Sequence, residues 1–142
     1  MTTTINAVSG NNLQVSADGS GVVKVQSNGV TTNALAWVNF DGTASTPITP
    51  NANYNVSSVT KNGTGDYTLN FTSTLTDANY AVATTCSVIA DQGSAYQFGP
   101  YVGVGGTMGT APTTKTTSAL RLLCRRDVSY DLKSANVVIF GN

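Results

Sequence analysis

The sequence predicts an all-β protein, an antiparallel β-sandwich or jelly-roll-like domain that follows an extended N-terminal arm. Apolar residues alternate with polar ones through most of the chain, a period of two that is typical of strands with one buried face. Asn-Gly and Asp-Gly pairs separate these runs and favour tight hairpin turns. The apolar spacing of an amphipathic helix is nearly absent, so short strands joined by turns predict a sandwich.

The first segment, residues 1–33, is predicted to be an arm used for assembly or attachment. It alternates only weakly, in "LQV" and "VVKV", between Gly-containing turns, and it contains no aromatic residue. Such a segment lacks the apolar area to close a core alone. We therefore expect it to pack on a neighbouring molecule, and we assign the β-sandwich domain to residues 34–142.

Three strands are predicted in the first half of that domain. Residues 35–40 alternate, and the large apolar area of Trp37 favours a place for it in the core. Next, "YNVSSV" and "YTLNF" flank Asn62-Gly63 and Gly65-Asp66, which predicts a hairpin with a loop of four or five residues. One face of its second strand is expected to be buried, and it consists of Tyr67, Leu69 and Phe71.

The second half continues the pattern. Residues 80–88 alternate in the same way, and residues 99–114, "GPYVGVGGTMGTAPTT", predict a long loop or hairpin tip of a length that is often functional. Residues 117–132, "TSALRLLCRRDVSYDL", are predicted to be a strand, since Leu120, Leu122 and Cys124 alternate with arginines. The final run "NVVIF" (residues 136–140) is apolar on both faces and predicts a central strand.

The residues that enzymes need for catalysis are missing or scattered. The chain has no histidine and no glutamate, and its aspartates lie singly, mostly at turns, where Asp bonds its own backbone. "GVGGTMG" (residues 103–109) lacks the spacing and the following Lys of a phosphate loop. No serine-nucleophile motif occurs. We expect no catalytic activity, no cofactor and no metal site.

The charge of the chain argues against nucleic acid as a partner. Charged residues make up 10% of the sequence and cancel to zero, whereas nucleic-acid binding depends on clustered Lys and Arg. No run approaches the roughly 18 apolar residues of a membrane span. "MTTTINAVSG" does not have the pattern of a signal peptide, so we expect synthesis in a reducing cytoplasm. Cys86 and Cys124 are then predicted to be buried free thiols, with a disulfide as the alternative.

Aromatic residues next to the Gly-rich stretch are the candidate contact site for a partner. Tyr96, Phe98 and Tyr101 alternate with Gln97 and Gly99. Exposed at a loop, their rings would stack on a glycan or contact an adaptable protein surface. The alternative is that they form the buried face of a strand, because aromatic side chains carry a large apolar area.

Three stretches, "ALAWVNFDGT" (residues 34–43), "YNVSSVTKNGTGDYTLNFTSTLTDANYAV" (residues 54–82) and "ANVVIFGN" (residues 135–142), resemble a module in structural proteins of tailed bacteriophages. That module is frequent at the C-terminus of tail-fibre and other virion-surface proteins. The opening "ADGSGVVKVQSNGV" (residues 17–30) is similar to the N-terminal arms of such proteins.

The resemblance implies a non-enzymatic β-rich virion protein, commonly a homotrimer, that contacts other virion proteins. The first interpretation is a tail-fibre or tail-spike component that contacts a glycan or a protein on the host surface. The alternative is a capsid decoration, cement or head-fibre protein that stabilises the head, which the short chain without a long shaft favours. In either case the protein is made in the bacterial cytoplasm and ends on the virion.

Overall fold

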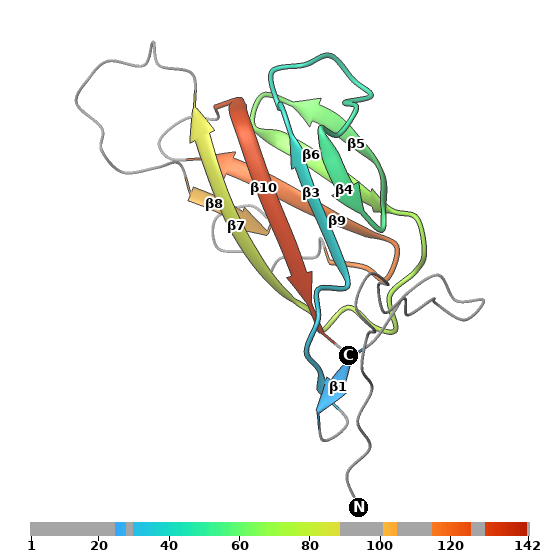
Figure 1. The fold of residues 1–142 in the computed structure, drawn as a ribbon. Helices are drawn as coiled ribbons and strands as arrows, with labels where there is room; N and C mark the ends of the chain where they lie inside the picture. Colours follow the sequence, from blue (N-terminus) through green and yellow to red (C-terminus); the bar gives the residue numbers. More distant parts are fainter. Residues whose placement is uncertain (1–24, 28–29, 89–100, 105–114, 126–129, 142) are drawn as a thin grey trace, which may run out of the picture.

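The computed structural model describes residues 25–27, 30–88, 101–104, 115–125 and 130–141, which form two antiparallel sheets and a small separate hairpin (Figure 1). The strands are β1 (Gln26–Ser27), β2 (Val30–Thr31), β3 (Ala36–Phe40), β4 (Ala52–Tyr54), β5 (Val56–Gly63), β6 (Asp66–Phe71), β7 (Ala81–Val88), β8 (Tyr101–Val104), β9 (Ala119–Arg125) and β10 (Leu132–Phe140). This confirms the prediction of an all-β fold. None of the described residues lies in a helix, so none belongs to a helix that could cross a membrane.

Each of the two larger sheets has four strands. The first sheet has the order β4-β3-β10-β7, and the second has the order β5-β6-β9-β8, with every neighbouring pair antiparallel. The third, small sheet pairs β1 with β2, and in Figure 1 β1 lies at the end of the sandwich where β3 begins. Residues 1–24 and 28–29 of the predicted arm lie outside the described residues, so the role of the arm stays a prediction.

The two sheets enclose one apolar core between their inner faces. The first sheet contributes Ala36, Val38, Phe40, Ala135, Val137 and Ile139, and the second contributes Val56, Val59, Tyr67, Leu69, Phe71, Leu120, Leu122 and Cys124. The rings of Phe40 and Tyr67 meet edge to face across this layer, with centroids 5.3 Å apart. Contacts of this kind join the two sheets into one hydrophobic unit, as the two faces of a sandwich require.

The predicted hairpin is present with a shorter loop. Gly63 pairs with Asp66, which leaves Thr64 and Gly65 between the strands instead of four or five residues. Gly65 has a φ of 67°, a left-handed conformation that glycine adopts without a steric penalty. An irregular register between Lys61 and Gly63 accommodates the additional residue. The burial of Tyr67, Leu69 and Phe71 on one face of β6 is as predicted.

Two predicted boundaries change, and one strand is less covered than predicted. Residues 117–132 do not form one strand, because β9 covers Ala119–Arg125 and Leu132 already begins β10. β10 is an interior strand between β3 and β7, as predicted, but its outer side is partly exposed, with Phe140 there 40% exposed. Within residues 99–114, Tyr101–Val104 form the edge strand β8, and residues 99–100 and 105–114 lie outside the described residues.

The prediction that Trp37 lies in the core is wrong. β3 buries Ala36, Val38 and Phe40, and this alternation turns Trp37 to the outer side, where it is 38% exposed. The inner face of β3 thus takes three apolar residues, whereas the face of Trp37 also carries Asn39. Burial of that second face would remove the amide of Asn39 from water, whereas burial of the first face carries no such cost.

Asn55 lies where the chain crosses from β4 in the first sheet to β5 in the second. Its φ of 55° is unusual for a residue other than glycine. Its buried amide donates to the carbonyl oxygens of Leu35 (3.1 Å) and Ser73 (3.2 Å), and its Oδ1 accepts from Ser73 N (2.8 Å). These bonds hold the chain in a strained conformation at this corner of the sandwich.

Candidate functional site

The contact residues predicted from the sequence remain untested. Tyr96 and Phe98 lie outside the described residues. Tyr101 begins β8, and its backbone pairs with Arg125 of β9, but its side chain is not described. The described surface offers a different candidate, the outer side of the first sheet.

We call this outer side the aromatic–amide face. Because side chains alternate along each strand, every second side chain of β4, β3, β10 and β7 points away from the core. Its members are Trp37, Asn39, Ala52, Tyr54, Ala81, Ala83, Thr85, Asn136, Val138 and Phe140. None of these side chains is charged.

One row of the face is a ladder of hydrogen-bonded amides that crosses the sheet. Asn51 Nδ2, from the residue before β4, donates to Asn39 Oδ1 at 2.8 Å. Asn39 Nδ2 in turn donates to Asn136 Oδ1 at 2.7 Å, and Asn136 Nδ2 donates to Thr85 Oγ1 at 3.2 Å. The register of the strands produces the ladder, since Asn136 lies directly opposite both Asn39 and Thr85.

The next row on the same face is apolar. Trp37 lies opposite Tyr54 on one side and Val138 on the other, and Val138 lies opposite Ala83. Phe140 lies one step further along β10, opposite Ala81. Ala81 and Ala83 of β7 are small, so they do not cover Phe140 and Val138 at this edge of the sheet. An exposed indole and an exposed phenyl ring thus lie on the same side of one sheet as the amide ladder.

Among the described residues, charged side chains lie at both ends of this sheet. At the end where β7 begins, Lys115 Nζ donates to the carbonyl oxygen of Tyr80 at 3.0 Å. The opposite end carries an ion pair. Lys133 Nζ lies 2.7 Å from Asp41 Oδ2, beyond the end of β3. The hydrogen bond from Lys133, followed by those from the hydroxyl and the N–H of Thr43, lowers the pKa of Asp41 to about 2. The Thr43 bonds confirm that this aspartate stabilises a turn, as predicted.

The outer side of the second sheet, which we call the hydroxyl–amide face, has a different chemistry. Its members are Ser58, Thr60, Asn62, Asp66, Thr68, Asn70, Ala119, Arg121 and Leu123. Asn70 Nδ2 donates to the hydroxyl oxygens of Ser58 (3.0 Å) and Thr60 (3.3 Å). Arg121 forms an ion pair with Asp66 through two nitrogens, with Nε 2.8 Å from Oδ1. None of these members, which come from β5, β6 and β9, is aromatic.

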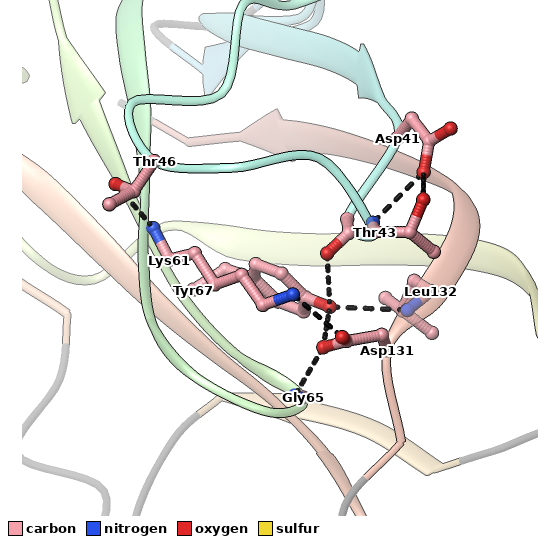
Figure 2. A network of polar contacts seen from close by, with 9 residues as sticks. Asp41, Thr43, Thr46, Lys61, Gly65, Tyr67, Asp131 and Leu132 are labelled. Atoms are coloured by element: carbon pink, nitrogen blue, oxygen red, sulfur yellow. Dashed lines mark hydrogen bonds and ion pairs between the residues drawn. The ribbon is translucent and has the colours of Figure 1, made fainter.

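A third polar feature, a half-buried cluster around Asp131, lies at the turn of the β5–β6 hairpin (Figure 2). Asp131 accepts from Lys61 Nζ at 2.6 Å and from the backbone N–H of Gly65 at 3.0 Å. The hydroxyl of Tyr67 lies within donating distance of Asp131 Oδ1 (3.0 Å) and of the carbonyl of Gly42 (3.2 Å), and it accepts from Leu132 N (3.1 Å). A Cβ on Gly42 would lie 2.5 Å from the Tyr67 hydroxyl, so glycine is required there.

The protonation states of this cluster indicate a structural role. Burial disfavours the charged form of Asp131, but the bonds from Lys61, Gly65 and Tyr67 outweigh it and lower its pKa overall. Burial raises the pKa of Tyr67 well above its usual value. At neutral pH the cluster is therefore an ionised carboxylate that accepts from an ammonium and a neutral phenol, and it ties the hairpin to the start of β10.

The two cysteines are free, as predicted, with Cys124 buried and Cys86 half-buried. Burial raises the pKa of both thiols, that of Cys124 to about 12, so both are protonated at neutral pH. No group of three or more Cys or Asp side chains suited to a metal ion occurs among the described residues.

The aromatic–amide face was missed at the level of sequence, although its signal was there. Alternation alone places Trp37 with Asn39, and Asn136 with Val138 and Phe140. The register that joins the two strands into one face cannot be read from the sequence. No protein-family model, no curated protein and no solved structure matches this chain.

Proposed function

We propose that the chain is a non-enzymatic structural protein of a tailed-bacteriophage virion, a tail-fibre or tail-spike component that contacts the host surface. The resemblance of residues 34–43, 54–82 and 135–142 to the phage module is the starting point. The all-β fold, with two sheets and a surface of hydroxyls and amides, agrees with what that resemblance implies. The protein would be made in the bacterial cytoplasm and assemble with other virion proteins as a homotrimer.

The aromatic–amide face carries the contact part of this proposal. Trp37 is 38% exposed and Phe140 is 40% exposed on one side of a regular sheet. Exposed aromatic side chains that gather in one patch mark interaction sites more often than single exposed residues do. The regular strands beneath this patch hold its side chains in fixed positions, which favours specific recognition over loose adhesion.

The position of the protein on the virion tests the proposal. We expect cryo-electron microscopy of the particle, combined with quantitative mass spectrometry, to place a few trimers on the tail. Hundreds of copies on the capsid would establish the head protein and end the tail interpretation. Complete absence from purified particles would overturn the virion assignment altogether.

Host contact needs a separate experiment. We expect purified protein to bind host cells and to compete with the phage for adsorption, and we expect Trp37→Ala to reduce both effects. Equal competition by wild type and by the variant would mean that contact is made elsewhere, for which residues 96–101 are the next candidate. Analytical ultracentrifugation of the same preparation reports whether the protein is trimeric.

A further inference from the structure

We propose that the aromatic–amide face is a binding site for an uncharged oligosaccharide chain, which lies across β3 and β10. This inference rests on the proposed contact with the host surface, because it names the chemical class of the ligand. It differs from the sequence-based hypothesis in placing the site on the sheet and not on residues 96–101.

The apolar row supplies surfaces for stacking. A sugar ring has an apolar side formed by its C–H groups, and an aromatic ring is the side chain that best matches it in shape and area. Trp37 lies between Tyr54 and Val138, so its neighbours limit the orientations of the indole before a ligand arrives. Phe140 offers a second ring on the same side of the sheet.

The amide ladder supplies hydrogen bonds next to those rings. A carboxamide has two N–H donors and an oxygen with two lone pairs. Asn136 uses one donor for Thr85 and one lone pair for Asn39, among the residues that the structure describes. One donor and one lone pair then remain for ligand hydroxyls. Because the ladder already fixes the amide, ordering it on binding costs little conformational entropy.

The absence of charge on the face selects an uncharged ligand. An acidic or basic partner would lose hydration on docking against Trp37 and Val138 without gaining an opposite charge there. The charged groups at the two ends of the sheet have partners, since Lys133 pairs with Asp41 and Lys115 donates to the Tyr80 carbonyl. Charge complementarity therefore favours neutral sugars over sialylated or sulfated ones.

The size of the face favours a short oligosaccharide over a second copy of the chain. Four strands about 4.8 Å apart, paired over about five residues with a rise of 3.4 Å, span roughly 300 Å². A stable protein–protein interface buries about 800 Å² on each partner. The face falls well short of that area, but it can accommodate a few sugar rings.

The chain has a built-in reporter for this site, since Trp37 is its only tryptophan. The probes are an array of neutral hexose and N-acetylhexosamine oligosaccharides, with sialylated and sulfated ones for comparison. We expect binding to members of the neutral set only. Titration of the best neutral oligosaccharide should change the Trp37 emission and protect it from quenching by acrylamide.

Matched variants locate the site. Trp37→Ala should weaken binding by about tenfold, whereas Trp37→Phe, which keeps a stacking ring, should retain most of it. Asn136→Asp places a charge in the ladder and should abolish binding. Its control, Asn70→Asp, places the same charge in the amide network of the opposite face and should leave binding unchanged. Circular dichroism checks that each variant is folded.

Three outcomes would overturn the inference. One is a lack of binding to any neutral oligosaccharide by protein that still adsorbs to host cells, which would leave the proposed function intact. Another is equal loss of binding in Asn70→Asp and Asn136→Asp. The third is a change in Trp37 emission with protein concentration alone, together with sedimentation as a larger species, which would show that the face binds a second copy.

Discussion

The two outer faces of the sandwich are built on equivalent sheets and carry different chemistry. Both sheets have four antiparallel strands, and both turn apolar residues inward. On the hydroxyl–amide face of the second sheet, polar side chains bond to one another: Asn70 bonds to Ser58 and Thr60, and Arg121 forms an ion pair with Asp66. The aromatic–amide face of the first sheet has a comparable amide network but adds Trp37 and Phe140 to it.

This difference separates the side chains that folding requires from those that it does not require. The inner faces resemble each other because both must fill one core. An outer face only has to remain solvated, and the described side chains of the hydroxyl–amide face, on β5, β6 and β9, do so without an aromatic residue. The exposed rings on the other side therefore call for an explanation other than stability. This separation can be tested by substitution, first in the layer that the two faces share.

The largest effect is expected in the shared layer, at Tyr67. Tyr67→Ala removes a fully buried ring and should lower the free energy of unfolding by about 3–5 kcal/mol. Tyr67→Phe keeps the ring but leaves the Leu132 N–H without its acceptor, which should cost about 1–3 kcal/mol. Urea denaturation monitored by Trp37 fluorescence measures both values. A loss below 1 kcal/mol for the alanine variant would mean that the sheets do not depend on this contact.

A smaller effect is expected at Asp131 at neutral pH. Asp131→Asn removes the charge that pairs with Lys61 and should cost about 1.5–3 kcal/mol at pH 7. The pKa of Asp131 is lowered in the folded state, so its contribution is complete above its unfolded pKa of about 3.9 and is lost as the pH falls through the folded value. The wild type should therefore lose stability in acid below about pH 4, and the variant should lose less.

Parallel slopes of stability against pH in wild type and Asp131→Asn would contradict this account of the cluster. Asp41→Asn provides a comparison, since the pKa of Asp41 is lowered to about 2 by Lys133 and Thr43. This exposed pair should change the acid slope in the same direction but contribute little at neutral pH.

On the hydroxyl–amide face, removal of the ion pair should have a modest effect. Arg121→Ala is expected to lower the free energy of unfolding by at most about 1 kcal/mol, and by less in high salt, because the pair is partly exposed. Thermal melts at low and high ionic strength measure this difference. A loss that is large and independent of salt would show that this face also has a role in stability.

The smallest effect on stability is expected on the aromatic–amide face. Asn136→Ala interrupts the ladder at an exposed position, and the free energy of unfolding should change by no more than about 0.5 kcal/mol. Chemical denaturation beside the wild type is the measurement. If the loss is instead as large as that of Tyr67→Phe, the ladder is needed for folding and the contrast between the faces disappears.

Much of the fold follows from local pattern. Alternation predicts β6, the apolar run of residues 136–140 predicts the interior position of β10, and Asn-Gly with Gly-Asp predicts the hairpin between β5 and β6. The predicted length of the hairpin loop was wrong, because a register shift at Lys61 and the left-handed conformation of Gly65 allow a tighter turn. Such adjustments depend on the pairing of the strands and leave no clear mark in the sequence.

The candidate site was predictable only in part, because it is formed by pairing between distant segments. The sequence shows that Trp37 and Asn39 share one side of a strand, but not which side faces the core. Large apolar area favoured burial of Trp37, whereas the complete apolar set on the opposite side of β3 decided the outcome. The ladder joins residues as far apart as Asn39 and Asn136, and the Asp131 cluster joins Lys61 to a residue 70 positions away.

The central place of β10 in the first sheet determines the order in which the chain can fold during translation. Asn39 and its partner Asn136 are 97 positions apart, a distance that a ribosome covers in roughly 5–20 s. The β5–β6 hairpin can pair within that time, because its strands are adjacent in sequence. The edges of β3 and β7 that face β10 have no strand to pair with until β10 has been synthesised. A nascent chain therefore carries two incomplete strand edges, and the first sheet closes last.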